Sequence, residues 1–279
     1  MDAPARRWSR RRRFVACVVP LLVASMAAVA YAQRVRGGWG SLPLATPESF
    51  DGAFQYCRAA FRGSGGFGGG FMTDYPDADR NLSVRLSELT KTPVSKDSTG
   101  EPRHLIVPLT SPELFRCPVI FMYEVGNFYI DDTEAAALRA YLLKGGFLWV
   151  DDFWGARAWD NWEGQIRKVF PSATYPIVEL TTEHPLFHQV QSVRTIPQIP
   201  SINYWLGSGG DTSERGPDSR TPHIRAITDD HGRIMVLMSF NTDFGDSYER
   251  EGINHEYFVT FSVPGYAFGV NALIYAMTH

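Results

Sequence analysis

Cysteine is scarce in this sequence, with three in 279 residues, and the common motifs of nucleophilic and metal-dependent enzymes are missing. No Gly-x-Ser-x-Gly elbow, His-Glu-x-x-His pair, Cys-x-x-Cys pair or EF-hand loop occurs. Cys17 lies in an apolar N-terminal run, which leaves Cys57 and Cys117. These two either form one disulfide in an oxidising compartment or remain buried thiols, and the sequence leaves both interpretations open. Covalent catalysis by serine or cysteine is therefore not favoured.

The N-terminus carries an export pattern. Six arginines within residues 6–13 precede an apolar run over residues 14–29, and Ala30-Tyr31-Ala32 follows as a small-x-small cleavage site. This predicts a signal peptide over residues 1–32, although an uncleaved membrane anchor is the other interpretation. The paired arginines also resemble a twin-arginine signal, so the general and twin-arginine export routes both stay open. We expect an exported protein, either periplasmic or extracellular.

Positive charge is in short supply beyond that segment. Without residues 1–32 the chain has 21 basic and 29 acidic residues, a formal charge of −8. A negative surface repels phosphate backbones, which argues against nucleic acid as a partner. No other segment is apolar enough to cross a bilayer, so we expect no transmembrane segment after signal cleavage. Residues 33–50 are predicted to be a linker, and residues 51–279 one α/β domain.

Strand-like and helix-like segments alternate through this domain. β-rich runs predict strands over residues 54–61, 104–107, 119–123, 147–150, 176–180, 224–228 and 234–240. Apolar spacing predicts helices over residues 80–89, 132–143, 159–170 and 267–277. The alternation predicts a three-layer α/β fold with a mostly parallel, doubly wound sheet. The glycine-rich segment 63–70 lacks a P-loop ending and is interpreted as a surface loop beside the site.

Acidic residues follow several of the predicted strands. They are Asp74, Asp77, Glu124, Asp151, Asp152, Asp243 and Asp246. Because ligands bind at the carboxyl ends of strands in an open α/β sheet, we expect these acids to converge. Clustered carboxylates raise one another's pKa or hold a hard divalent cation such as Ca²⁺ or Mg²⁺, and added histidine would suit Zn²⁺. The other interpretation is that they only cap the helices that follow.

Aromatic residues accompany these acids, and Phe153 and Trp154 directly follow one acid pair in the chain. Aromatic and acidic side chains together suit a carbohydrate or a cationic ligand, while core packing is the other interpretation. A histidine in Glu183-His184-Pro185 is added as a neighbour of the pocket. The candidate ligand-binding residues are Asp74, Glu124, Asp151, Asp152, Trp154, His184, Asp243 and Asp246.

An ordered set of motifs resembles the bacterial DUF4159 family. The motifs are Phe71–Pro76, Tyr123–Val125, Gly145–Asp152, Glu183–Phe187, Asn241–Asp246 and Gly269–Ala276. The resemblance covers most of residues 52–278 and implies a flavodoxin-like domain of the class I glutamine amidotransferase-like superfamily. The helix-Gly-Gly-strand segment is also similar to ThuA-like proteins. The amidotransferase nucleophile would be a cysteine in the elbow where this chain has Asp151, Asp152 and Phe153, so the resemblance transfers no glutaminase activity.

Three functions fit these features, and the sequence does not establish whether the protein is an enzyme. The first is an exported, amidotransferase-like domain that binds a small polar ligand or an envelope protein without covalent catalysis. The second is a metal-assisted hydrolase of an envelope carbohydrate or peptide, in which an acid or His184 would be the general base. The third is a scaffold component of an envelope complex.

Overall fold

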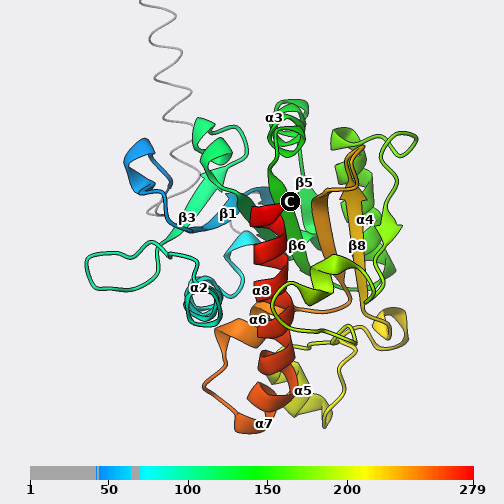
Figure 1. Cartoon of the computed structure of the whole chain (residues 1–279). Helices are drawn as coiled ribbons and strands as arrows, with labels where there is room; N and C mark the ends of the chain where they lie inside the picture. The colour runs from blue at the N-terminus through cyan, green and yellow to red at the C-terminus, as the bar shows by residue number, and fades with distance from the viewer. Residues whose placement is uncertain (1–41, 43, 64–69) are drawn as a thin grey trace, which may run out of the picture. The chain divides into compact units, whose positions relative to one another are not determined.

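A seven-stranded sheet is the central layer of this computed structural model, which describes residues 42, 44–63 and 70–279 (Figure 1). In sheet order the strands are β3 (His104–Pro108), β1 (Tyr56–Ala60), β4 (Val119–Tyr123), β6 (Phe147–Phe153), β9 (Ile234–Phe240), β8 (His223–Thr228) and β7 (Val178–Glu179). The first five strands are parallel, and β8 pairs antiparallel with both of its neighbours. The prediction of a mostly parallel sheet is confirmed.

Helices cover both faces of the sheet because alternate strand residues present apolar side chains to each side. On one face lie α2 (Asp77–Leu89), α6 (Phe244–Glu249) and α8 (Val263–Thr278); on the other lie α3 (Asp132–Leu143) and α4 (Gly155–Val169) (Figure 1). On the α8 face, the ring of Trp149 lies 5.7 Å from that of Phe244 and 5.5 Å from that of Phe268. The resulting three-layer α/β arrangement is consistent with the flavodoxin-like fold that the sequence predicted.

Short elements complete the domain. A two-stranded sheet pairs β2 (Arg62–Gly63) with β5 (Phe128–Tyr129), and the small helices are α5 (Ile202–Ser208) and α7 (His255–Tyr257). The 3₁₀ helices are η1 (Pro47–Ser49), η2 (Gly70–Met72), η3 (Pro112–Arg116), η4 (Val125–Asn127), η5 (Pro185–His188) and η6 (Gly216–Ser219). The π-helical turn η7 (Phe258–Ser262) joins α7 to α8.

Some predictions fall on residues outside the described part of the chain. The predicted signal peptide (1–32) lies wholly there, and so do residues 64–69 of the glycine-rich segment. The predicted linker (33–50) is described only near its end. There, Leu44 bridges Ile106 in parallel beside β3, so these last residues extend the edge of the sheet.

The C-terminal helix is apolar along most of its length. Contrary to the expectation that no segment beyond the N-terminus is apolar enough to cross a bilayer, His255–Thr278 is so by length and composition, yet 61% of the apolar window is buried inside the domain. The buried Asn271 accepts hydrogen bonds from the backbone N–H groups of Val190 and Gln191, at 2.8 and 3.0 Å. Such burial and polar contacts are those of a core helix.

Two cysteines are joined across neighbouring strands. Cys57 in β1 forms a disulfide with Cys117, which lies just before β4, and their Cα atoms are 6.2 Å apart. β1 and β4 are adjacent parallel strands in which Cys57 is in register with Ile120, and Cys117 lies three residues before Ile120 in the segment that enters β4. Of the two interpretations that the sequence left open, the structure has the disulfide.

Two element boundaries near the site differ from the predictions. The strand predicted to end at Val150 continues as β6 through Phe153, because pairing with β9 resumes between Phe153 and Phe240. Between Val150 and Phe153 the register shifts, and Asp152 adopts a left-handed conformation (φ 53°). Such a bulge redirects the side chains of a strand. The acid pair is therefore part of β6, whereas the sequence placed it after the strand.

The helix predicted from Trp159 begins earlier, at Gly155. The residue at its N-cap position, Trp154, makes no capping hydrogen bond, so local sequence gives no start signal. The cap comes instead from a distant loop: Asp218 Oδ2 accepts a hydrogen bond from the backbone N–H of Ala156 at 2.9 Å. This contact draws the loop before β8 towards the edge of the sheet where β6 ends.

Candidate functional site

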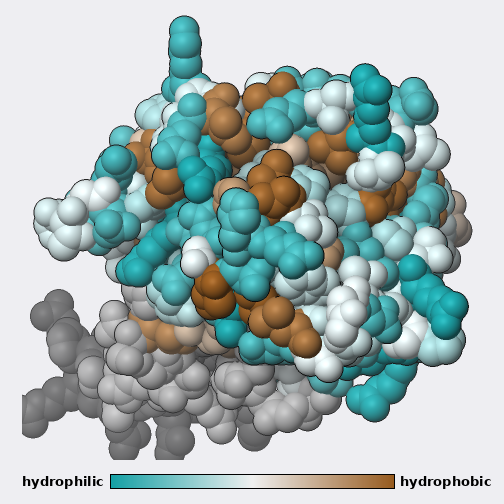
Figure 2. All heavy atoms as spheres, turned by 90° about the horizontal axis from the view of Figure 1, so that it is seen from below, coloured by the Kyte–Doolittle hydropathy of each residue, from teal (hydrophilic) through white to brown (hydrophobic). Residues whose placement is uncertain are grey.

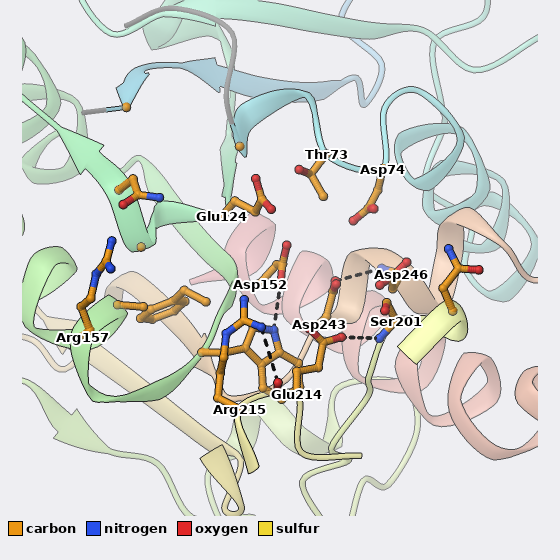
Figure 3. Close-up of a pocket in the computed structure, with 18 of the residues that line it drawn as sticks. Thr73, Asp74, Glu124, Asp152, Arg157, Ser201, Glu214, Arg215, Asp243 and Asp246 are labelled. Atoms are coloured by element: carbon orange, nitrogen blue, oxygen red, sulfur yellow. Dashed lines mark hydrogen bonds between the residues drawn. The ribbon is translucent and has the colours of Figure 1, made fainter. Parts of the chain in front are cut away.

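A cavity of about 1020 Å³ opens at the carboxyl edge of the parallel strands (Figure 3). Its walls come from the segments after β1, β4, β6 and β9 and from residues 201–218. The charged and hydrogen-bonding side chains on these walls are those of Thr73, Asp74, Glu124, Asn127, Asp152, Trp154, Arg157, Ser201, Asn203, Glu214, Arg215, Asp218, Asp243, Asp246 and Arg250. Segments distant in sequence meet here because parallel strands end at the same edge of a sheet.

Most of the acids singled out in the sequence face this cavity. The predicted ligand-binding residues that line it are Asp74, Glu124, Asp152, Trp154, Asp243 and Asp246. Figure 3 shows the side chain of Asp74 directed towards that of Asp246, with Asp152 and Asp243 beside them. Asp243 is also the N-cap of α6, where its Oδ1 accepts the backbone N–H of Asp246 at 2.9 Å. Asp243 therefore both caps α6 and lines the cavity.

Asp151 lies beneath the cavity and does not line it. Its carboxyl group is buried, with Oδ1 accepting from Ser239 Oγ at 2.6 Å and Oδ2 accepting from the backbone N–H of Gly245 at 2.9 Å. Burial raises the pKa of Asp151 to about 7, although these hydrogen bonds oppose the shift. Asp151 thus connects β6 to β9 and to the first turn of α6, and it positions the residues that face the cavity.

The expectation that His184 lies around the pocket needs correction. Its imidazole packs 5.7 Å from the ring of Tyr275 in α8, and its Nδ1 accepts the backbone N–H of Leu186. The segment turns into η5 at Pro185, which packs against α8 instead of reaching the cavity. Burial lowers the pKa of His184, and the neighbouring His279 lowers it further. Its contacts are those of a structural residue.

Backbone conformations at this edge are unusual. Within the described residues, positive φ angles outside glycine occur at Asp74 (60°), Glu124 (48°), Asp152 (53°) and Asn241 (60°). The first three line the cavity, and Asn241 accepts the N–H of Gly155 through its Oδ1 at 2.9 Å. Left-handed conformations cost on the order of 1–3 kcal/mol and cluster at functional sites. The fold therefore holds these acids in conformations that their local sequence does not favour.

The acids of the cavity disfavour one another's ionisation. Burial raises the pKa of Asp74, Asp152 and Asp243 well above the ordinary value for aspartate, and neighbouring carboxylates raise it further. Burial also raises the pKa of Asp246 to about 6. At neutral pH the cluster must either keep protons or bear a repulsion that a cation would relieve.

Arginine side chains lie mostly on another side of the cavity. In Figure 3, Arg157 and Arg215 lie away from Asp74. Neither forms an ion pair with an acid within the described part of the chain, and Arg250, also on the wall, pairs with Glu249 just outside it (Nε to Oε2, 2.5 Å). The protein therefore provides an acidic side and a basic side to one cavity, and each can meet an opposite charge on a ligand.

Sequence reasoning missed one whole wall of the site. Ser201, Asn203, Glu214, Arg215 and Asp218 all come from the segment that includes α5 and η6. No element and no site residue was predicted in this segment. The signal that could have found it is its length, because a connection this long inside a domain is usually functional.

Comparison with known families identifies the domain. The family model for DUF4159, described as a domain of unknown function, matches residues 60–277. That range includes every acid that lines the cavity and the strands that carry them. No curated protein matches the chain. The matched region spans nearly the whole domain, from β1 to α8, and the chain belongs to the DUF4159 family.

Proposed function

We propose that this chain is an exported envelope protein whose cavity binds a small polar ligand that carries a cationic group. The observation that carries the proposal is the gathering of four buried or half-buried carboxyl groups, from separate segments, around one open cavity: Asp74, Asp152, Asp243 and Asp246. Like charges placed this close together destabilise a fold, and such clusters are found mainly where they serve a functional site. A cationic group in the cavity relieves that repulsion.

The other walls narrow the chemistry of the ligand. Phe61, Phe153 and Trp154 contribute aromatic surface, and Arg157 and Arg215 face the cavity from the side away from Asp74. Aromatic surface with a few convergent polar groups is typical of small-molecule sites. A ligand with an amine at the acidic side and hydroxyl or anionic groups at the arginine side, such as an amino sugar, fits this division.

Covalent catalysis is not part of the proposal. Both cysteines of the described domain are used in the Cys57–Cys117 disulfide, so neither supplies a thiolate. An amidotransferase-like domain would need its nucleophile at the carboxyl end of β6, and Asp152, with a φ of 53°, lies there. In our proposal the likeness to that superfamily concerns the scaffold, and the reaction is absent.

Export is part of the same proposal, and the disulfide supports it. Disulfides persist in oxidising compartments and are rare in the cytosol. Together with the arginine-rich and apolar N-terminal pattern, this favours an envelope location. The test is the N-terminal sequence of the protein recovered from the host envelope. We expect it to begin at Gln33; a cytosolic protein with an intact residue 1 would contradict export.

The binding test uses titration calorimetry with glucosamine and spermidine as cationic probes and glucose as the neutral comparison. We expect saturable binding of at least one amine and none of glucose. Asp152→Asn should weaken amine binding about tenfold, since charged hydrogen bonds contribute roughly 1.5–3 kcal/mol. The matched control is Asp230→Asn, an exposed acid in the β8–β9 turn. Amine binding that is unchanged in Asp152→Asn, or absent in the wild type, would refute the proposal.

A second candidate function is a metal-assisted hydrolase acting on an envelope carbohydrate or peptide. The specific observation in its favour is that Asp74, Asp246 and Glu249 each place a carboxylate oxygen within 4.8 Å of the others. A cavity acid with a raised pKa, such as Asp152, would then be the general base. Turnover of a chromogenic glycoside or peptide that needs added Mn²⁺ and is lost in Asp152→Asn would favour this candidate over simple binding.

A further inference from the structure

Three carboxylates converge at one end of the cavity. One oxygen from each of Asp74, Asp246 and Glu249 lies within 4.8 Å of the other two. Asp246 and Glu249 are three residues apart in α6, so both project from the same side of that helix. Asp74 approaches them from the loop that precedes α2. A group of oxygens at this spacing, drawn from two elements, has the size of a coordination shell for a single ion.

Asp74 also has a carboxylate oxygen without a hydrogen-bond partner among the described residues. Asp74 Oδ2 is fully buried and accepts no hydrogen bond from any described residue. A Cβ atom on Gly245 would lie 2.4 Å from it, so the carboxylate packs directly on the bare backbone of that glycine. The N–H of Gly245 cannot serve it, since it donates to Asp151 Oδ2 at 2.9 Å. A buried carboxylate oxygen without a hydrogen-bond partner destabilises the fold unless a bound ion or ligand contacts it.

We propose that Asp74, Asp246 and Glu249 bind a hard divalent cation of the Ca²⁺ and Mg²⁺ class. All three ligands are oxygens, which such cations prefer, and no sulfur or imidazole group takes part. The ion would neutralise the Asp74 and Asp246 end of the acidic cluster and leave Asp152 and Asp243 to the cationic group of the ligand. This role rests on the proposed function, whereas the binding of the ion does not.

An arginine of the same chain would compete with this ion for Glu249. Arg250 Nε lies 2.5 Å from Glu249 Oε2, and the guanidinium lines the same cavity. A cation at the three carboxylates must share Glu249 with this arginine. Removing the arginine charge should therefore strengthen cation binding, while removing a ligand charge should weaken it. Variants with opposite expected signs separate loss of a site from general damage to the fold.

The experiment is calorimetric titration of the full chain, stripped with EDTA and dialysed, with CaCl₂, MgCl₂ and MnCl₂. We expect binding of one ion per chain for at least one of the three. Glu249→Gln and Asp246→Asn should each weaken it about tenfold or more, and Arg250→Gln should tighten it several-fold. Glu88→Gln, which removes an exposed acid of α2 that pairs with Arg85, should leave it unchanged.

Two results would overturn the inference. One is the absence of saturable binding for all three ions by a wild-type chain with a native circular dichroism spectrum. The other is equal affinity in wild type, Glu249→Gln and Arg250→Gln. Titration of spermidine and glucosamine in the presence of EDTA keeps the two proposals apart. Amine binding without ion binding refutes the cation site alone, and ion binding without amine binding refutes only the proposed ligand.

Discussion

Two kinds of buried carboxyl group lie close together in the sequence of this protein, and their surroundings differ. Asp79 in α2 is fully buried with Arg58 of β1, whose Nε lies 2.8 and 2.9 Å from the two carboxylate oxygens. Burial lowers the pKa of Arg58, but the Asp79 carboxylate outweighs this effect and the net shift is upward. Asp74, in the preceding loop, has a buried oxygen with no hydrogen-bond partner among the described residues.

The comparison shows that burial alone does not identify a functional acid. The guanidinium group of Arg58 contacts both carboxylate oxygens of Asp79, so the charge of Asp79 has an opposite charge beside it within the fold. Asp74 and the acids around it depend on protons or on an external cation. The two regions are also connected, because Arg58 donates to the carbonyl oxygen of Thr73 at 2.5 Å and so holds the backbone next to Asp74. The Arg58–Asp79 ion pair therefore supports the loop that carries Asp74, whose charge has no such partner among the described residues.

The largest expected effect comes from breaking the compensated pair. Arg58→Met leaves the Asp79 carboxyl group buried without its cation, and we expect a loss of about 3–5 kcal/mol in the free energy of unfolding. Urea unfolding measures this loss. The double variant Arg58→Met with Asp79→Leu should recover most of it, because no unpaired charge then remains. A single variant as stable as the wild type would show that the pair is not structural.

The next effect is the pH dependence of the wild type. The folded-state pKa of Asp151 is raised to about 7 by burial, against about 3.9 in an unfolded chain, so the folded state retains the proton over that interval. Its contribution to stability is therefore complete below about pH 4 and is lost as the pH rises through 7. We expect the free energy of unfolding, measured in EDTA, to fall between pH 5 and pH 8. A free energy of unfolding that stays constant between pH 5 and pH 8 would contradict the burial of Asp151 without a compensating positive charge.

A smaller effect is expected from neutralising one acid of the cavity. Asparagine at position 152 tolerates the φ of 53°, so Asp152→Asn removes the charge without straining the backbone. Burial and the nearby Glu124 both raise the pKa of the Asp152 carboxyl group. At pH 8 we expect a gain on the order of 1 kcal/mol in the free energy of unfolding, as is common when a functional residue is replaced. At pH 4, where the wild-type carboxyl is protonated, the gain should vanish. The control Asp230→Asn should change stability by no more than about 0.5 kcal/mol at either pH.

Much of the fold could be predicted because its signals are local. Asp131 and Glu134 form a capping box at the start of α3, and apolar runs bounded by turns mark the parallel strands. The convergence of the acids followed from one rule about parallel sheets, which requires only that the strands be identified.

The remainder depends on contacts between distant segments. The start of α4 is capped by Asp218, and no residue near Gly155 signals it. The bulge in β6 arises from its register with β9, a pairing that the sequence of β6 does not reveal. His184 was predicted to lie around the pocket, but η5 turns it towards α8. These are tertiary effects, and they decide which side chains reach the cavity.

The most direct test of the uncompensated cavity is titration of the aspartate carboxyl groups by ¹³C NMR in the selectively labelled protein, without divalent cations. The account predicts that Asp151 titrates with a pKa of about 7 and Asp246 with one of about 6, while the exposed Asp97 titrates below its usual range because Thr99 donates hydrogen bonds to its carboxylate. If Asp246 in the cavity and Asp151 beneath it both titrate near the ordinary value of about 4, the cluster is already neutralised within the protein and the case for a cationic ligand fails.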